Sequence, residues 1–543
     1  MGCRRRSVDT MVTTLPQRQT EVLIVGAGPT GLMAAVVLAR AGIDAVLIDP
    51  KSGPTRESRA LGVQARSMEL YDQLGLVDRV LAGSTTAEAL ELGWADRPGH
   101  RLELTFVQEQ LSRYPGLHVF EQSRNEQLLV EALDAVGRTV SWGERLVDLT
   151  TGPDGVVALT DTSSGDEPAD WELSRISARW CIGADGAGSA VRRLLDVSFD
   201  GVTDPGRFWV ADVRGVHGLP EGVINLRPSR EDLLLTFPLG ADGHVRLLGI
   251  VGDDQPTAES VIPRAAATYG FDYGPVEWFA HYRVHHRVAS AFRRGPVFLA
   301  GDAAHVHSPV GGQGMNTGLQ DAHNLALAIA DVASGRTDGS DGAERRLDRY
   351  QAERMPVARH LVELTDRAFG VMSGRTRGRS LVRRLVATNL APVALAVVPR
   401  LPARKRFGGY LGQTRIRYPM PAGDDPVVGR RLPPAGDNHD LLRDFGWQLH
   451  RYGGTVATAD GETLGEPEEI AGATDDEVAA DVAASRLPEW IGGPFALPAD
   501  REGTLRPDRL YLIRPDGFVA ASAPAGDPTP LLSALAAHGL GPS

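Results

Sequence analysis

The sequence predicts an α/β protein of three parts: a Rossmann-like domain, a β-sheet domain inserted into it, and a small C-terminal α/β domain. A βαβ unit predicts the first part, because apolar strands at residues 21–25 and 45–48 flank a helix over 30–40. The second part is predicted because residues 208–286 are β-rich and show few helical periods. The third follows a boundary rich in Pro and Gly at 419–434.

The expected domain boundaries lie where these patterns change. After the inserted segment, apolar residues return at helical spacing in 319–333 and 347–368, which indicates that the chain re-enters the first domain. The expected parts are a disordered leader at 1–19, a discontinuous first domain at 20–205 and 287–400, an inserted sheet domain at 206–286, and a C-terminal domain at 425–543.

Composition favours a globular protein that acts on small molecules. Hydrophobic residues make up 42% of the 543 residues and charged residues 23%, and the net charge of -12 argues against nucleic-acid and anionic-membrane surfaces. Cys3 and Cys181 are far apart, so they support neither a disulfide framework nor a thiolate metal cluster. No apolar run is long enough to cross a bilayer. We therefore expect a cytoplasmic protein.

The first βαβ turn has the pattern of a dinucleotide-binding loop. Gly26 allows the tight turn, Gly28 lets a pyrophosphate approach the backbone, and Gly31 permits close packing of the helix. Pro29 and Thr30 open that helix, and Asp49 ends the second strand, where it can accept a hydrogen bond from a ribose hydroxyl.

Two later strands also run into glycine turns followed by helices. The strand at 179–183 leads into Asp185-Gly186, and the strand at 296–300 leads into the segment 301–316. Glycines let the backbone of that segment approach a flat or anionic group, and amides entering a helix direct partial positive charge toward it. Asp302 supplies an acceptor suited to a sugar hydroxyl.

With these three turns placed, the chain resembles the flavin-dependent aromatic hydroxylases of the p-hydroxybenzoate hydroxylase and phenol hydroxylase type, in particular the bacterial hydroxylases of aromatic polyketides. The resemblance implies FAD, with Asp49 on the adenosine side and Asp302 on the ribitol and pyrophosphate side. It places Pro309 and residues 314–316 beside the isoalloxazine ring. The Asp185 turn would support both FAD and transiently bound NADH or NADPH.

Smaller matches extend the resemblance. Arg59 and Gln122 stand where the family has FAD-contacting side chains, Arg287 resembles a recurrent arginine near the flavin, and residues 350–356 look like the helix that follows the flavin loop. The C-terminal domain is similar to a thioredoxin-like appendage without the redox CxxC. The expected cofactor-binding residues are Gly26, Gly28, Pro29, Thr30, Gly31, Asp49, Arg59, Gln122, Asp185, Asp302, Pro309, Gly314, Met315 and Asn316, and Pro309 and Arg287 are expected at the reacting centre.

The resemblance implies a single-component monooxygenase that hydroxylates a phenolic or polycyclic aromatic substrate with NAD(P)H and O2, through a flavin C4a-hydroperoxide. One alternative keeps the fold but changes the outcome to Baeyer–Villiger insertion, epoxidation or oxidative inactivation of an antibiotic. Another is a flavoprotein-fold binding protein without turnover. A third alternative is an FAD dehydrogenase that does not use oxygen. The resemblance leaves the oligomeric state open, with a homodimer among the options.

The remaining candidate residues concern metal and substrate. His305 and His307 alternate beside the third turn, but no cluster of further ligands completes a metal site, so no metal is expected. We expect His305 to bond to the loop backbone. The substrate should lie between the inserted sheet and the flavin, because ligand pockets form at domain interfaces. The candidates to line that pocket are Phe237, Pro238, Trp278 and Tyr282.

Overall fold

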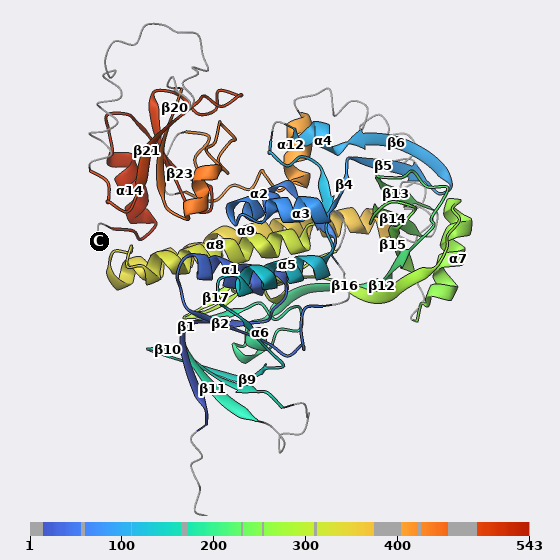
Figure 1. Cartoon of the computed structure of the whole chain (residues 1–543), viewed down its shortest axis with the longest axis horizontal. Coiled ribbons are helices and arrows are strands. Elements are labelled where there is room, and N and C mark those ends of the chain that lie inside the picture. Colours follow the sequence, from blue (N-terminus) through green and yellow to red (C-terminus); the bar gives the residue numbers. More distant parts are fainter. Residues whose placement is uncertain are drawn as a thin grey trace, which may run out of the picture.

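The computed structural model describes residues 15–55, 60–109, 111–163, 172–229, 232–251, 255–308, 312–373, 403–420, 425–453 and 486–541. Its largest elements are two eight-stranded sheets, and a four-stranded sheet lies near the C-terminus. Long helices run across the middle of the molecule, with the first sheet below them and the second sheet to the right (Figure 1). The α/β fold expected from the sequence is confirmed.

The first sheet has the order β17-β18-β11-β1-β2-β8, and its parallel part carries the dinucleotide-type turn. β10 extends it through antiparallel pairing with β11, and β9 pairs antiparallel with β10. The strands are β1 (Gln17–Val25), β2 (Ala45–Asp49), β8 (Val140–Trp142), β9 (Arg145–Gly152), β10 (Gly155–Asp161), β11 (Leu173–Gly183), β17 (Arg293–Arg294) and β18 (Val297–Leu299). β1 begins within the segment expected to be a leader. The expected end of the leader at residue 19 is therefore wrong, because residues 17–20 pair in parallel with 175–178 of β11.

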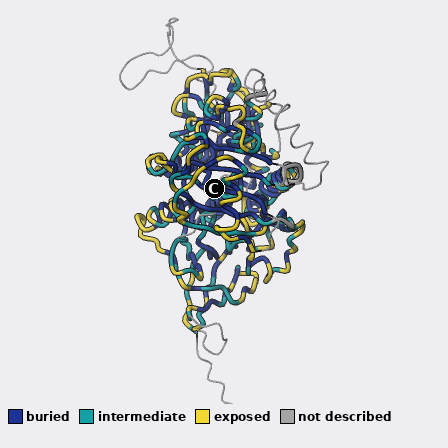
Figure 2. The backbone as a smooth tube through the Cα atoms, turned by 90° about the vertical axis from the view of Figure 1, so that its right-hand side faces the viewer, coloured by how far each residue is buried: buried dark blue, intermediate teal, exposed yellow. Residues whose placement is uncertain are grey.

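The helices beside this sheet form the main core. α1 is apolar over nearly all of its surface, and every residue from 31 to 38 is buried, because the sheet, α5 and α8 surround it. Figure 2 shows this buried centre in dark blue, with exposed backbone at the periphery. The helices are α1 (Pro29–Arg40), α2 (Ala65–Gln73), α3 (Val77–Gly83), α5 (Gln122–Asp134), α6 (Ala190–Leu194), α8 (Gly314–Ala333) and α9 (Gly339–Ser373). No helix in the described part of the chain combines the length and apolar character needed to cross a membrane.

The second sheet has the order β19-β16-β12-β15-β14-β13-β5-β6. Helix α7 packs on one face, while α4 and α12 lie on the side of the other face. The elements are β5 (Ala89–Trp94), β6 (Arg97–Glu103), α4 (Leu104–Gln108), β12 (Phe199–Val213), β13 (Ile224–Pro228), β14 (Leu233–Pro238), β15 (Val245–Val251), α7 (Ala258–Tyr269), β16 (Val276–Ala289), β19 (His305–Val306) and α12 (Ala403–Leu411). β3 (Gly62–Val63), β4 (Thr85–Ala87) and β7 (Leu117–Val119) form a small third sheet. The second sheet thus recruits β5 and β6 from outside the segment 206–286.

The C-terminal unit is a mixed sheet of order β21-β20-β22-β23 with one helix packed against it. β20 pairs in parallel with β21 and antiparallel with β22. The elements are β20 (Gln448–Tyr452), β21 (Gly492–Leu497), β22 (Arg509–Ile513), β23 (Val519–Pro524) and α14 (Thr529–Ala537). Apolar clusters cover both faces, one around Trp447 and one around Val427.

Some sequence-based expectations fall outside the described residues. They are the first fourteen residues of the leader, Arg59, Pro309, and the end of the first domain from 374 to 400.

Candidate active site

The three glycine turns lie at one edge of the parallel sheet. β1, β11 and β18 are neighbours, and each ends just before one of the turns. Backbone hydrogen bonds join the ends: the Ala184 amide donates to the Val25 carbonyl at 2.8 Å, and the Ala300 amide donates to the Gly183 carbonyl at 3.0 Å. Ligands of open α/β sheets bind outside the carboxyl ends of the strands. The three turns therefore form one site.

Thr30 packs between two glycines from distant parts of the chain. A Cβ atom added to Gly301 or to Gly318 would lie 2.4 Å from the Thr30 Oγ1 atom. Thr30 is in the first turn of α1, Gly301 opens the third glycine turn, and Gly318 is in α8. Only glycine permits such close approaches. Thr30, one of the expected cofactor-binding residues, therefore packs α1 closely against α8.

The first turn leaves a helix end open toward the site. Gly26 has φ +104°, and a Cβ on Gly31 would lie 1.8 Å from the Gly26 carbonyl oxygen, so both glycines are required by the protein itself. Gly28 differs, because no atom lies within 4 Å of its Cβ position. Gly28 is also the N-cap of α1, which has no side-chain cap and has Pro29 in its first turn. The open amides of this turn suit an anionic group.

Asp49 is buried and holds the first turn in shape. Its Oδ2 accepts a hydrogen bond from the Ala27 amide at 2.6 Å, and its Oδ1 accepts one from the Lys51 amide at 2.8 Å. Gln122 lies close by and donates from Nε2 to Glu126 Oε1 at 3.0 Å. Glu126 in turn pairs with Lys51 at 3.3 Å. These contacts place Asp49 and Gln122 at the entrance of the first turn, and their binding to a ribose or flavin stays a prediction.

The second turn is fixed by Asp185 and Arg192. Asp185 Oδ2 accepts hydrogen bonds from the Ala190 amide at 2.6 Å and the Val191 amide at 3.1 Å, which caps α6. Burial raises the pKa of Asp185, and its Oδ1 is buried without a partner among the described residues. Arg192 donates to the Ala187 carbonyl at 2.6 Å and to the Ala303 carbonyl at 2.8 Å. Arg192 thereby ties the second turn to the third.

The third turn exposes one carboxylate and buries another. Asp302 is exposed, although Gly301 and Ala303 on either side of it are buried. Asp321 of α8 lies fully buried beneath the turn and accepts from the Gly301 amide at 3.2 Å and from His305 Nε2 at 2.6 Å. The expectation for His305 was wrong in its partner, since the imidazole bonds to a carboxylate of α8 and not to the loop backbone. Helix packing brings that carboxylate beneath the loop.

The start of α8 is anchored through Asn316. Its Oδ1 accepts from the Gln64 amide at 2.8 Å, and its Nδ2 donates to the Gly62 and Gly312 carbonyls, each at 2.7 Å. α8 has no side-chain cap, so the amides of its first residues, Gly314 and Met315, have no capping side chain. The structure thus places Gly314, Met315 and Asn316 together at an open helix end beside β3.

His307 is held neutral at this helix end. Burial lowers its pKa to about 4, and its Nδ1 lies 2.7 Å from the Ser308 carbonyl, to which it donates. Its Nε2 is buried without a partner among the described residues, and a Cβ on Gly314 would lie 3.5 Å from it. The described residues contain no group of three His, Cys, Asp or Glu side chains arranged to hold a metal ion.

Three of the four expected substrate residues share one face of the second sheet. Strand pairing aligns Phe237, Arg246, Asp212 and Trp278 in one row across four strands. Tyr282 lies four residues further along β16 on the same face, and its ring stacks on Phe208 with centroids 5.9 Å apart. This is the face that packs toward α4 and α12.

Pro238 lies on the opposite face of that sheet. Side chains alternate along a strand, so Pro238 points away from Phe237. It lines a separate cavity of about 400 Å³ together with Val216 and Leu219. The structure therefore separates Pro238 from the other three candidates.

Arg287 lies beside the strand β19 of the third turn. Its backbone pairs with Val306 of β19, and its Nη2 donates to Thr203 Oγ1 at 2.9 Å. His285 Nδ1 also lies 2.9 Å from Thr203 Oγ1. Arg287 is thus one strand away from the third turn, and a role at the reacting centre stays a prediction.

Comparison with known proteins identifies the family to which the chain belongs. A family model described as FAD binding domain matches residues 19–365. The chain belongs to this FAD-binding domain family. The 12-dehydrotetracycline 5-monooxygenase/anhydrotetracycline 6-monooxygenase of Streptomyces rimosus subsp. rimosus is 32% identical over 528 residues, which are 93% of this chain and 95% of that protein.

Two further similarities agree with this membership. Rifampicin monooxygenase of Streptomyces venezuelae is 34% identical over 444 residues, covering 78% of this chain and 84% of that protein. The solved structure of OxyS anhydrotetracycline hydroxylase from Streptomyces rimosus has a TM-score of 0.72 and 28% identity, covering 97% of this chain and 100% of that one. The matches to the tetracycline-related monooxygenase and to the OxyS structure span 93% and 97% of this chain. It is an FAD-dependent monooxygenase.

The residues present at the site fit FAD. Gly28, the N-cap of α1, provides no side-chain cap, and no atom lies within 4 Å of its Cβ position, so a pyrophosphate can approach the first amides of the helix. The exposed Asp302 suits the hydroxyls of a flavin side chain. Asp185 Oδ1 is one further polar atom at the turns, buried and without a partner among the described residues. Each of these features comes from a different glycine turn of the FAD-binding domain.

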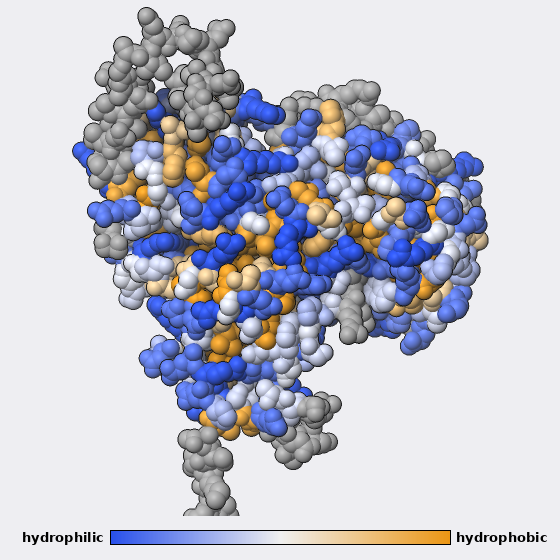
Figure 3. Space-filling model, viewed as in Figure 1, coloured by the Kyte–Doolittle hydropathy of each residue, from blue (hydrophilic) through white to orange (hydrophobic). Residues whose placement is uncertain are grey.

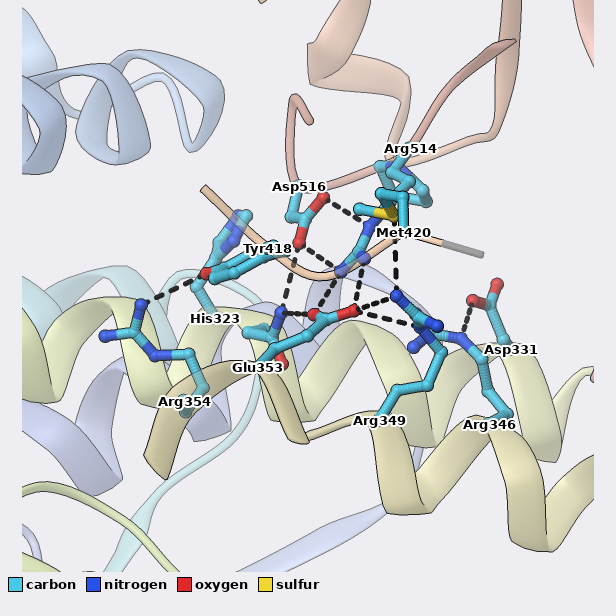
Figure 4. A network of polar contacts seen from close by, with 12 residues as sticks. His323, Asp331, Arg346, Arg349, Glu353, Arg354, Tyr418, Met420, Arg514 and Asp516 are labelled. Carbon is cyan, nitrogen blue, oxygen red and sulfur yellow. Dashed lines mark hydrogen bonds and ion pairs between the residues drawn. The ribbon is translucent and has the colours of Figure 1, made fainter. Parts of the chain in front are cut away.

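Sequence reasoning missed the charged residues that support the third glycine turn from beneath. Asp321 Oδ1 also accepts from Arg354 Nε at 2.6 Å, and the Arg354 Nη1 donates to Tyr418 Oη at 3.1 Å. Next to them, Glu353 pairs with Arg514 of the C-terminal unit at 2.6 Å (Figure 4). A signal for this existed, because charged residues interrupt the apolar face of both α8 and α9. Buried charges must be paired, so such positions indicate partners.

Proposed function

We propose that this monooxygenase hydroxylates a phenolic or polycyclic aromatic substrate, consuming NADH or NADPH and O2. The observation that carries the proposal is the pairing of one FAD-type site with an aromatic face, formed by Phe237, Trp278 and Tyr282 on the second sheet. The near full-length relative that is named for action on 12-dehydrotetracycline and anhydrotetracycline supports the same substrate class. Outcomes such as Baeyer–Villiger insertion or epoxidation have no separate observation in their favour.

The proposed cofactor contacts follow the three turns. The amides of Gly28, Thr30 and Gly31 would hold the pyrophosphate, Asp49 and Gln122 would lie on the adenosine side, and Asp302 would hold the ribitol. When bound, FAD supplies the hydride acceptor and the activation of O2. The amides of Gly314 and Met315 would stabilise negative charge near the ring, because they open a helix of twenty residues. The aromatic face would exclude water from the reacting carbon.

We also propose that residues 425–543 form a thioredoxin-like unit without redox function, in a cytoplasmic protein able to form a homodimer. The mixed four-stranded sheet with one helix against it supports the fold, and the only cysteines of the chain, Cys3 and Cys181, lie outside this unit. The net charge of -12 supports a protein without nucleic-acid or membrane partners.

The test of the proposed function is substrate-dependent turnover. The purified protein should show a flavin absorption spectrum and should oxidise NADH or NADPH faster when phenols or anthraquinones are added, with product structures showing an added hydroxyl group. A flavin-containing protein with no substrate-stimulated oxidation across the panel would favour the binding-protein alternative. A colourless protein that cannot be reconstituted with FAD would overturn the proposal.

A further inference from the structure

A second cavity lies away from the three turns, between the C-terminal unit and the segment that follows α12. Its volume is about 940 Å³, and its walls come from residues 405–417 on one side and from 430–436 and 498–504 on the other. Figure 1 shows α12 and the C-terminal unit on either side of this region, and Figure 3 shows hydrophilic residues gathered between them. We refer to it as the basic cleft.

The basic cleft concentrates positive charge on an acidic protein. Eight Lys or Arg side chains line it against three Asp or Glu side chains, although the whole chain carries -12. The three that form ion pairs are Arg113 with Asp440 at 3.0 Å, Lys405 with Glu502 at 2.6 Å, and Arg431 with Glu69 at 2.6 Å. The remaining five have no ion pair within the described part of the chain: Arg406, Arg415, Arg417, Arg430 and Arg501.

Two of these unpaired arginines face each other. Arg417 and Arg430 are partners in an isolated antiparallel bridge, held by the Tyr418 amide donating to the Gly429 carbonyl at 2.8 Å. Like charges directly opposite each other destabilise a β pair. Both side chains are exposed to the cleft, so an anion bound between them would remove the repulsion.

Two buried polar atoms without hydrogen-bond partners also indicate that the basic cleft can bind a ligand. Thr414 Oγ1 and Arg431 Nε are buried without a partner among the described residues, and both residues line the cleft. Arg431 is only 7% exposed. Asp500 forms no ion pair with these arginines in the described part of the chain, and its oxygens accept from the Thr504 amide at 3.0 Å and the Leu505 amide at 2.8 Å.

We propose that the basic cleft binds a small molecule that carries a phosphate or diphosphate group. Guanidinium groups offer only donors, in a planar arrangement that matches phosphate oxygens. The cleft has the volume of a small-molecule site. This binding site is separate from the flavin site, and its existence does not depend on the substrate proposed above.

The experiment titrates inorganic pyrophosphate into the full-length enzyme saturated with FAD, by calorimetry at low ionic strength. We expect saturable binding at one site that weakens as NaCl is raised. The double variant Arg417→Ala/Arg430→Ala should weaken binding at least tenfold. The matched control is Arg138→Ala/Arg214→Ala, which removes the same charge from two exposed arginines paired elsewhere with Asp44 and Glu277. This control should bind as the wild type does.

Two results would overturn the proposal: no saturable binding to the wild type, or equal weakening in both double variants, which would show an effect of net charge alone. The Arg417→Lys/Arg430→Lys variant keeps the positive charge and controls for misfolding of the alanine double variant. It should bind pyrophosphate more weakly than the wild type but more tightly than the alanine double variant. Competition identifies the source of the phosphate. Displacement of pyrophosphate by NADP+ or ADP would support a nucleotide, and its retention would support a free phosphate or diphosphate.

Discussion

Asp321 and Arg354 form a fully buried ion pair, with 2.6 Å between Asp321 Oδ1 and Arg354 Nε. Burial alone would raise the pKa of Asp321, but Arg354 and His305 outweigh it and hold that pKa below its usual value. The other carboxylate oxygen accepts from His305 and from the Gly301 amide. One carboxylate of α8 therefore fixes both α9 and the turn that carries Asp302.

Replacing this carboxylate should damage stability and the flavin site together. Asp321→Asn leaves the buried Arg354 without its counter-charge, so the free energy of unfolding should fall by about 3–5 kcal/mol. Urea unfolding measures this loss, and FAD titration should show weaker binding because the Gly301 turn loses its anchor. Asp44→Asn is the control, since Asp44 pairs with Arg138 at the surface and should change stability by about 1 kcal/mol or less. Equal losses in the two variants would contradict this account.

Buried histidines predict a loss of stability in mild acid. Burial lowers the pKa of His307 and His439 to about 4, and that of His323 and His450 to about 3. Between pH 6.5 and 4 the unfolded chain therefore binds more protons than the folded one, and the free energy of unfolding falls as pH decreases. Melting temperatures measured from pH 8 to pH 5 should be flat above about pH 7 and fall below about pH 6.5. A melting temperature unchanged down to pH 5 would refute this prediction.

Substitution of Gly28 tests pyrophosphate binding at the start of α1 without disturbing the fold. No protein atom lies within 4 Å of the Gly28 Cβ position, so Gly28→Ala should change the stability of the FAD-free protein by less than about 1 kcal/mol. The added methyl group would stand where the ligand approaches the backbone, so the Kd for FAD should rise at least tenfold. Gly152→Ala is the matched control, because that glycine is equally open but lies in β9. Unchanged FAD affinity in Gly28→Ala would place the pyrophosphate elsewhere.

The two faces of the second sheet predict opposite effects on the substrate. Tyr282→Ala removes an aromatic side chain from the proposed substrate face, so kcat/KM should fall by about tenfold or more, in line with about 1.5–3 kcal/mol for burial of a large apolar side chain. Pro238→Ala, on the other face, should leave kcat/KM within about twofold. Steady-state kinetics on the FAD-saturated variants gives both values. A larger effect from Pro238→Ala would reverse the assignment of the faces.

The glycine turns were predictable because their signals are local. The strand ending at Val25, the turn from Gly26 to Gly31 and the helix that follows lie within consecutive residues, and glycine positions that require close approach can be recognised from spacing alone. The same holds for Asp185 and Asp302, each of which follows a strand whose last residues are buried.

Other features were not predictable because they depend on how elements pack. His305 and Asp321 are 16 residues apart and Arg354 is a further 33 residues along, so their contact exists only once α8 and α9 lie together. That Phe237 and Pro238 point to opposite faces follows from alternation along one strand, but which of the two faces packs toward α4 and α12 depends on long-range packing. β5 and β6 join the second sheet through parallel pairing with β13, a long-range contact without a local signal.

The most direct test of the central claim is the fate of labelled oxygen. With FAD-saturated enzyme, NADPH or NADH and an accepted aromatic substrate under ¹⁸O2, mass spectrometry should find one ¹⁸O atom in each hydroxylated product molecule. A product without the label, or one whose new oxygen comes from labelled water, would contradict the assignment of this protein as an FAD-dependent monooxygenase.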